Sequence, residues 1–201
     1  MRTGHRKSAP EVTGGKVQKK NNWEVSPNYY DSPQVMPIID RKRPGKGYRH
    51  ILKKKDIYDF ISILPDWPEL SRGLNAVVLA PGDFSLYGYH VPGVVHVCAW
   101  AEDLWIECEP FYYERDQAIL ERLGVPCLPT NNNIYICRFN ESTARAFQLL
   151  EILLHELGHH HDRITTRSQR RASRGEPYAE EYARRYQAQI WDDYRRRFEL
   201  Y

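Results

Sequence analysis

The side chains best placed to do chemistry together lie in residues 155–162, which read His-Glu-Leu-Gly-His-His-His-Asp. Residues four apart lie on the same face of a helix, so His155 and His159 can direct two imidazoles at one metal ion. Glu156 lies one position further round, where its carboxylate can act on a metal-bound water without being a ligand. This spacing predicts a metal site on a helix.

The helix that must carry these residues is expected to lie at the centre of the domain. Asn140 is a favourable N-cap, with Glu141 and Thr143 in the first turn. Residues 146–157 are apolar on nearly every side, which is typical of a buried helix. Burying several histidines there without a metal or a polar network would cost several kcal/mol. Gly158 costs about 1 kcal/mol relative to alanine inside a helix, which suggests that another element approaches it closely.

The pattern H-E-x-x-H is typical of zinc hydrolases, whose catalytic ion needs a third protein ligand and an open position for water. A third histidine in the extended pattern H-E-x-x-H-x-x-G-x-x-H is excluded, because Asp162 and Thr165 occupy the positions of that glycine and histidine. A later helix offers Glu176 and Glu180 instead, four apart on one face.

The sequence from Glu176 to Ala183 reads E-P-Y-A-E-E-Y-A, an E-x-x-A-E-x-Y-A pattern. With the H-E-x-x-H segment, it resembles the zincin metallopeptidases of gluzincin type, in particular the compact ImmA/IrrE-like peptidases and the lethal-factor-type toxin proteases. The resemblance covers these two helices only. It implies that His155, His159 and Glu176 bind one catalytic Zn²⁺ and that Glu156 is the general base. Glu180 is then an acidic residue that holds a ligand histidine through its second ring nitrogen. If Pro177 instead makes Glu176 the N-cap of the helix, Glu180 is the third ligand; both alternatives stay open.

The same resemblance implies a reaction and a substrate. The zinc would activate a water molecule for attack on a peptide bond, with His161, Tyr178 and Tyr182 as unranked candidates for stabilising the oxyanion. Zincins bind the substrate backbone along an edge strand, and the strand expected at residues 134–139 is the candidate for that role. The predicted partner is therefore a protein or peptide substrate.

The rest of the chain predicts an α+β fold. We expect a zincin-like minimal metallopeptidase domain, with a small, mostly antiparallel sheet packed on the central helix and a C-terminal helix. Residues 94–100 and 104–109 are expected to form a hairpin, and residues 113–123 a helix with Ala118, Ile119 and Leu123 inward. The other predicted elements are helices at 55–64 and 69–72, strands at 76–79 and 84–91, and a last helix from Pro177 with its apolar stripe at Tyr178, Tyr182, Tyr186, Ile190, Tyr194 and Phe198.

Charge divides the chain into two parts. Residues 1–55 hold 14 Lys and Arg against 4 Asp and Glu, whereas residues 56–201 hold 15 against 22. Residues 1–47 are polar and lack an apolar period, so they are predicted to be a disordered basic tail ahead of a domain at 48–201. A solvated tail is the simplest interpretation; binding of nucleic acid or an acidic partner through residues 1–55 is the alternative.

Cysteines and hydropathy give an expected location. Cys98, Cys108, Cys127 and Cys137 form no close pair in sequence and are interpreted as reduced, buried thiols of a cytoplasmic protein, with disulfides left open for an exported one. No apolar run suggests a signal peptide or a membrane span. The predicted function is a zinc-dependent peptidase. The alternative is a zincin-fold binding or regulatory protein with little hydrolytic activity, against which Glu156 argues because a binding protein does not need the base.

Overall fold

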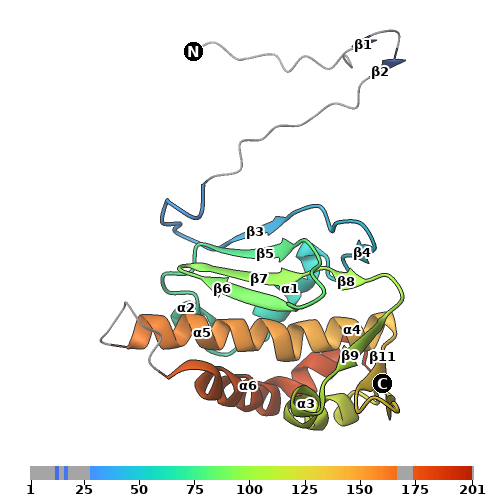
Figure 1. Cartoon of the computed structure of the whole chain (residues 1–201). Helices are drawn as coiled ribbons and strands as arrows, with labels where there is room; N and C mark the ends of the chain where they lie inside the picture. The colour runs from blue at the N-terminus through green and yellow to red at the C-terminus, as the bar shows by residue number, and fades with distance from the viewer. Residues whose placement is uncertain (1–11, 14–15, 18–27, 167–173, 201) are drawn as a thin grey trace, which may run out of the picture.

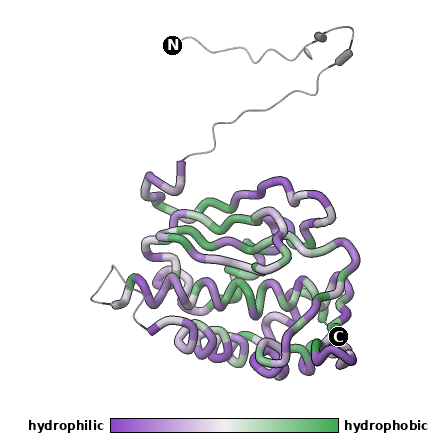
Figure 2. Tube along the Cα trace, viewed as in Figure 1, coloured by the Kyte–Doolittle hydropathy of each residue, from purple (hydrophilic) through white to green (hydrophobic). Residues whose placement is uncertain are grey.

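A computed structural model describes residues 12–13, 16–17, 28–166 and 174–200 of the 201-residue chain. The fold is α+β, as predicted. Figure 1 shows a sheet, the long helix that carries His155 and a C-terminal helix arranged as successive layers. Figure 2 shows apolar segments of the chain gathered along the inner strands and along the long helix.

The main sheet lies against the central helix and has the strand order β3-β5-β7-β6. Its inner strands are parallel to one another, and only the edge strand β6 runs antiparallel to its neighbour β7. The expectation of a mostly antiparallel sheet is therefore wrong for this layer, although it holds for the smaller β10-β11-β9 and β4-β8 sheets. The strand bounds in the main sheet are β3 Ile38–Arg41, β5 Ala76–Ala80, β6 Gly88–Val91 and β7 Val94–Cys98.

The predicted hairpin between residues 94–100 and 104–109 is wrong. Strand β7 turns back on β6 through Pro92 and Gly93, and Gly93 has a φ of 76° that suits glycine. The chain then continues into β8 (Trp100–Ala101), which pairs with β4 (Tyr48–Arg49). Strand β9 (Trp105–Cys108) pairs with β11 (Tyr135–Arg138) instead of β7.

Strand β11 also pairs with β10 (Cys127–Pro129), so it is the central strand of its sheet. The prediction that residues 134–139 form a substrate-binding edge is therefore wrong, because both sides of that strand are already hydrogen-bonded. The free edge beside the central helix belongs to β6, which ends the main sheet among the described strands and packs on α5.

The central helix is continuous from Glu141 to Thr165 but is not uniform. It consists of α4 (Glu141–Phe147), a π-helical segment η1 (Gln148–Leu153) and α5 (Leu154–Thr165). Asn140 caps it as predicted, with its side chain accepting a hydrogen bond from the Thr143 N–H. The π-helical segment was not predicted. It is buried throughout, and Gln187 from the last helix donates a hydrogen bond to the Leu150 carbonyl within it.

The last helix, α6 (Gly175–Phe198), packs along α5 at the point where Gly158 lacks a side chain. A Cβ on Gly158 would lie 2.8 Å from the Cα of Ala179 and 3.1 Å from the Cβ of Tyr182. The predicted close approach to Gly158 is thus confirmed, and Ala179 and Ala183 are both fully buried beside it. The predicted stripe on α6 is also confirmed, with Tyr182, Tyr186, Ile190 and Tyr194 buried and Tyr178 and Phe198 packed against the core.

The remaining helices are close to their predicted positions. They are α1 (Lys54–Ile61), α2 (Trp67–Leu70) and α3 (Pro110–Arg122). Ile119 and Leu123 are buried and Gly124 ends α3 with a φ of 66°, as expected, but Ala118 is exposed and Leu120 is buried instead.

The predicted tail contains structure where it reaches the domain. Ile39 is 3% exposed in β3, and Tyr29 packs on the outer face of the sheet, so residues 28–47 belong to the folded unit. Val12–Thr13 and Lys16–Val17 form the short pair β1 and β2; the rest of the predicted tail lies outside the described residues. None of the helices in the described ranges is both long and apolar enough to cross a membrane.

Two of the four cysteines depart from the prediction. Cys127 and Cys137 face each other across β10 and β11 and form a disulfide. Their separation of ten residues is not a close sequence pair, so only the register of the two strands brings them together. Cys98 and Cys108 are buried free thiols, as predicted.

Candidate metal centre

Three side chains from two helices converge on one point. Ligand atoms of His155, His159 and Glu176 all lie within 4.8 Å of one another. The Nε2 atoms of His155 and His159 are 3.0 Å apart. The carboxylate oxygens of Glu176 lie 3.1 Å from the His155 Nε2 and 3.3 Å from the His159 Nε2. Neutral imidazole nitrogens and a carboxylate are the donor set that Zn²⁺ prefers, so these residues fit such an ion.

The centre is half enclosed. The side chains of His155 and His159 are 15% and 18% exposed, whereas that of Glu176 is 66% exposed. Burial, with His159 as a second cause, lowers the pKa of His155 to about 4, so its imidazole is neutral at pH 7 and able to coordinate. The open side beside Glu176 leaves room for water or a substrate.

Glu156 lies beside the cluster and is nearly buried. Burial raises the pKa of its carboxyl to about 8, with the nearby Glu176 charge adding to the effect. A carboxyl with this pKa can hold a proton near neutral pH and release it again, as general acid–base chemistry requires.

The edge strand β6 passes directly over Glu156 because residue 88 is glycine. A Cβ at Gly88 would lie 3.0 Å from the Glu156 Oε1 and 2.6 Å from a methyl carbon of Ile152. Any larger residue there would displace the strand from α5 or push Glu156 aside. Gly88 therefore brings the free edge of β6 against the general-base candidate.

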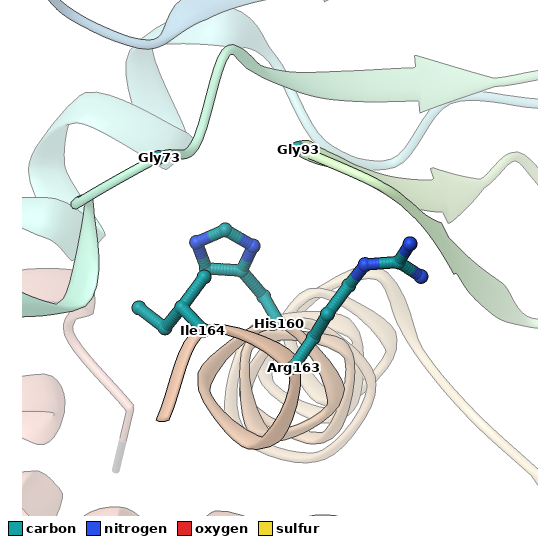
Figure 3. Close-up of a pocket in the computed structure, with 5 residues that line it drawn as sticks. All are labelled: Gly73, Gly93, His160, Arg163 and Ile164. Atoms are coloured by element: carbon teal, nitrogen blue, oxygen red, sulfur yellow. The ribbon is translucent and has the colours of Figure 1, made fainter. Parts of the chain in front are cut away.

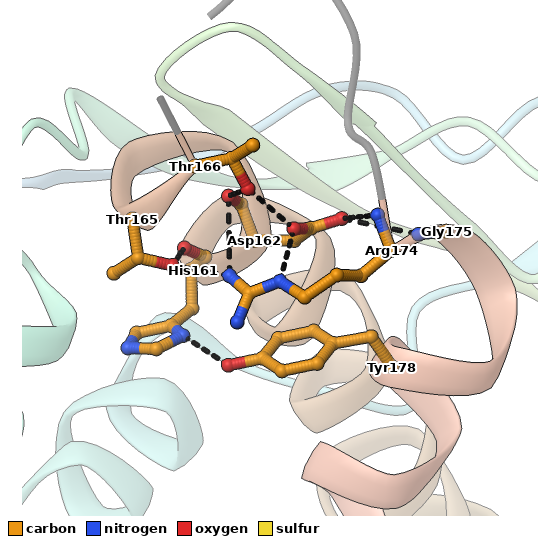
Figure 4. Close-up of polar contacts among 7 residues, drawn as sticks. All are labelled: His161, Asp162, Thr165, Thr166, Arg174, Gly175 and Tyr178. Atoms are coloured by element: carbon orange, nitrogen blue, oxygen red, sulfur yellow. Dashed lines mark hydrogen bonds and ion pairs between the residues drawn. The ribbon is translucent and has the colours of Figure 1, made fainter. Parts of the chain in front are cut away.

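The end of α5 fixes the start of α6, and with it Glu176. Asp162 is fully buried, and its Oδ2 accepts hydrogen bonds of 3.1 Å from the backbone N–H groups of Arg174 and Gly175. Its Oδ1 accepts from the Arg174 Nε at 2.7 Å and from the Thr166 hydroxyl at 2.8 Å (Figure 4). Burial alone would raise the pKa of Asp162, but these donors outweigh burial and lower it.

This anchoring decides between the two candidate glutamates on geometry. Arg174 is the N-cap of α6, so Glu176 lies inside the first turn, and the expectation that Pro177 makes Glu176 the N-cap is wrong. Glu176 then reaches the two histidines, whereas the Glu180 carboxylate lies beside Arg184, with 3.8 Å between Oε2 and the guanidinium.

Of the three candidate oxyanion donors, His161 and Tyr178 are bonded to each other, whereas the buried Tyr182 hydroxyl has no hydrogen-bond partner among the described residues. His161 Nδ1 and the Tyr178 hydroxyl are hydrogen-bonded at 2.6 Å, and the Arg174 guanidinium lies 3.8 Å from the centre of the Tyr178 ring (Figure 4). Tyr182 is 2% exposed between the helices. Their assignment to the oxyanion stays a prediction.

A separate pocket lies against another side of α5. It has a volume of about 300 Å³ and is lined by Gly73, Gly93, His160, Arg163 and Ile164 (Figure 3). His160 donates from Nε2 to the Arg72 carbonyl at 3.0 Å, which ties α5 to the connection after α2. None of the three cluster residues lines this pocket, so His160 is not part of the candidate metal centre.

Comparison with protein-family models, curated proteins and solved structures gives no match for this chain.

Two residues that support the centre were not predicted. Gly88 lies inside a predicted strand, where a glycine often marks a close approach of another element, so the sequence contained a signal for it. Asp162 entered the sequence analysis only as the residue that breaks the extended histidine pattern. Its partners include backbone groups twelve and thirteen residues later, which no local pattern identifies.

Proposed function

We propose that this protein is a zinc-dependent peptidase of zincin type. The observation that carries the proposal is the convergence of His155, His159 and Glu176 beside a buried Glu156. A purely structural zinc site would have four protein ligands. It would not need Glu156, which is placed as a base and not as a ligand.

His155, His159 and Glu176 would hold the ion. When bound, zinc lowers the pKa of a coordinated water and polarises the scissile carbonyl. Glu156 accepts the proton of the attacking water and delivers it to the leaving amine. Its burial beneath Gly88 keeps bulk water from competing for that proton.

The edge strand β6 is the element that would bind the substrate backbone. Its outer edge is unpaired among the described strands, and it crosses Glu156 at Gly88. An extended peptide paired with this edge would place its carbonyl groups above the centre. This assigns to β6 the role that the sequence had suggested for residues 134–139.

Metal analysis and one isosteric substitution test the proposal. Elemental analysis of the purified protein should give about one zinc per chain, and His155→Ala combined with His159→Ala should abolish it. Glu156→Gln should retain the zinc and lower the hydrolysis of a mixed peptide library by about 10²–10⁴-fold. Glu181→Gln, a change of the same type at an exposed position on α6, should alter neither.

Two results would count against the peptidase. One is a wild-type protein that holds zinc and cleaves no peptide in the library. The other is hydrolysis that persists unchanged in Glu156→Gln, because then another group, or a contaminant, moves the proton.

A further inference from the structure

An aromatic pocket with an acidic rim lies at the beginning of β6. It has a volume of about 280 Å³ and is formed by the loop before β6, the β4-β8 pair and β9. Its aromatic walls are Tyr48, Phe84, Tyr87, Trp100 and Trp105. Two of them, Tyr87 and Trp100, are stacked with ring centres 5.8 Å apart.

Three carboxylates line the same pocket. Asp83, Asp103 and Glu107 are all exposed, and none forms an ion pair with any described residue. No Lys, Arg or His is among the lining residues. Among the described residues, the pocket therefore combines ring faces with negative charge and has no cationic side chain.

The walls are held in place by tight local packing. The Tyr48 ring lies on Gly82, where an added Cβ would come within 2.0 Å of a ring carbon. Trp100 is 3% exposed and packs edge-on against Phe139 at 5.0 Å, and its indole N–H has no hydrogen-bond partner among the described residues. Two walls of the pocket, Tyr48 and Trp100, are thus fixed side chains, whereas Phe84 is exposed.

We infer that this pocket binds a lysine or arginine side chain of the polypeptide substrate. Ring faces attract a cation and also cover an alkyl stem, and the carboxylates pair with the charged end. The Asp83 carboxylate already accepts hydrogen bonds from the Ser85 N–H and hydroxyl. An uncharged apolar side chain would satisfy the rings but would leave Asp103 and Glu107 without an ion-pair partner. The chemistry of the pocket selects a long basic side chain.

The position of the pocket connects it to the proposed reaction, so this inference rests on the proposed function. Tyr87 lines the pocket, and the next residue, Gly88, is the one that lies against Glu156. A paired strand advances about 3.3 Å per residue. A peptide lying along β6 would reach the pocket within a few residues of the scissile bond.

Binding by the Glu156→Gln protein tests the inference without turnover. Fluorescence anisotropy would compare labelled peptides that differ at one position, carrying lysine, arginine or the uncharged isostere norleucine, with that position scanned on both sides of the scissile bond. Lysine and arginine should bind about tenfold more tightly than norleucine at one position. Asp103→Asn combined with Glu107→Gln should remove that preference.

A matched pair of substitutions controls for net charge. Glu102→Gln combined with Glu109→Gln removes the same charge from exposed neighbours that do not line the pocket, and should leave the preference intact. Phe84→Ser, at a side chain that is 91% exposed, should weaken the preference without unfolding the protein.

The outcomes separate the two proposals. Equal binding of lysine and norleucine, or equal effects of the two double substitutions, would overturn the pocket assignment even if the wild-type protein hydrolyses peptides. A lysine preference that depends on Asp103 and Glu107 would support the pocket even if hydrolysis proves independent of Glu156, in which case only the peptidase proposal fails.

Discussion

The segment 155–162 has a first half, taken as residues 155–159, and a second half, residues 160–162; the two carry similar side chains but satisfy them differently. In the first half, His155 and His159 turn toward Glu176, so three groups able to bind a cation face one another. In the second half, His160, His161 and Asp162 each have partners within the protein, and the Asp162 carboxylate accepts four hydrogen bonds from three residues. A polar residue next to the candidate ligands is thus not itself a candidate; what distinguishes the candidate ligands is that their ligand atoms converge on one point.

The two halves also depend on each other. Asp162 holds the first residues of α6, and α6 brings Glu176 back to the histidines one turn earlier. The second half therefore positions Glu176 in the candidate metal centre through the backbone of α6. Four experiments would sharpen or break this division.

The largest effect is expected from exchanging the third ligand. Glu176→Gln should weaken zinc binding by more than about a hundredfold, because it removes a ligand, whereas loss of an outer partner typically costs 10–100-fold. Glu180→Gln should cost less than about tenfold. Competition with a chelating dye measures both affinities, and the reverse ranking would move the centre one turn along α6.

Asp162→Asn should destabilise the protein without touching the ligands directly. Removing one charge from a buried, paired site typically costs 3–5 kcal/mol, so urea unfolding of the metal-free protein should show a loss of about 3 kcal/mol. Because the pKa of Asp162 is lowered in the folded protein, this stabilisation is present above its ordinary value of 3.8 and is lost as the pH falls through the folded-state pKa.

A surface pair provides the control for Asp162. Asp193→Asn removes an exposed partner of Arg196 and should change the stability by less than about 1 kcal/mol. Similar losses for the two variants would mean that the anchor of α6 lies elsewhere.

Gly158→Ala tests the contact between the two halves of the segment and α6. Helix propensity alone would make alanine more stable by about 1 kcal/mol. The added Cβ would meet the Ala179 backbone at 2.8 Å, so we expect a net destabilisation of about 2 kcal/mol. A stabilised Gly158→Ala protein would show that the helices can separate there at no cost.

Glu151, one turn before His155, is a buried carboxylate with fewer hydrogen-bond donors than Asp162. Burial, followed by the charge of Asp116, raises its pKa to about 7, while its contact with Gln187 acts in the opposite direction. A raised carboxyl pKa means that stability falls as the pH rises from 4.5 to 7. Glu151→Gln should therefore be more stable than wild type by about 2 kcal/mol at pH 8 and differ least at pH 4.5. Thermal unfolding across this range measures the difference, and parallel curves would show that Glu151 does not titrate there.

Local signals predicted the helices well because each was specified by adjacent residues. Asn140 and Thr143 form the cap that the sequence indicated, and Gly124 ends α3 in the expected conformation. The E-x-x-A-E-x-Y-A pattern predicted that α6 lies against the helix carrying His155 and His159, and Gly158 is the point of contact.

Pairings between distant segments were not predicted, because alternation identifies a strand but not its neighbour. Strand β9 has the apolar pattern of a hairpin arm, yet its partner is β11. The disulfide between Cys127 and Cys137 depends on the same register. The choice between Glu176 and Glu180 depended on where α6 begins, which Asp162 sets from the other helix.

The π-helical segment before His155 sets the rotation of α5 about the helix axis relative to α4. An α-helix turns about 100° per residue, and a π-helical turn holds one residue more. The extra residue in Gln148–Leu153 therefore changes the direction in which His155 points. In a regular α-helix starting at the Asn140 cap, residue 155 would face a different side. A related chain with a regular α-helix here would reach the same imidazole geometry with one residue fewer, so a single-residue gap in the middle of this helix is compatible with an unchanged metal centre.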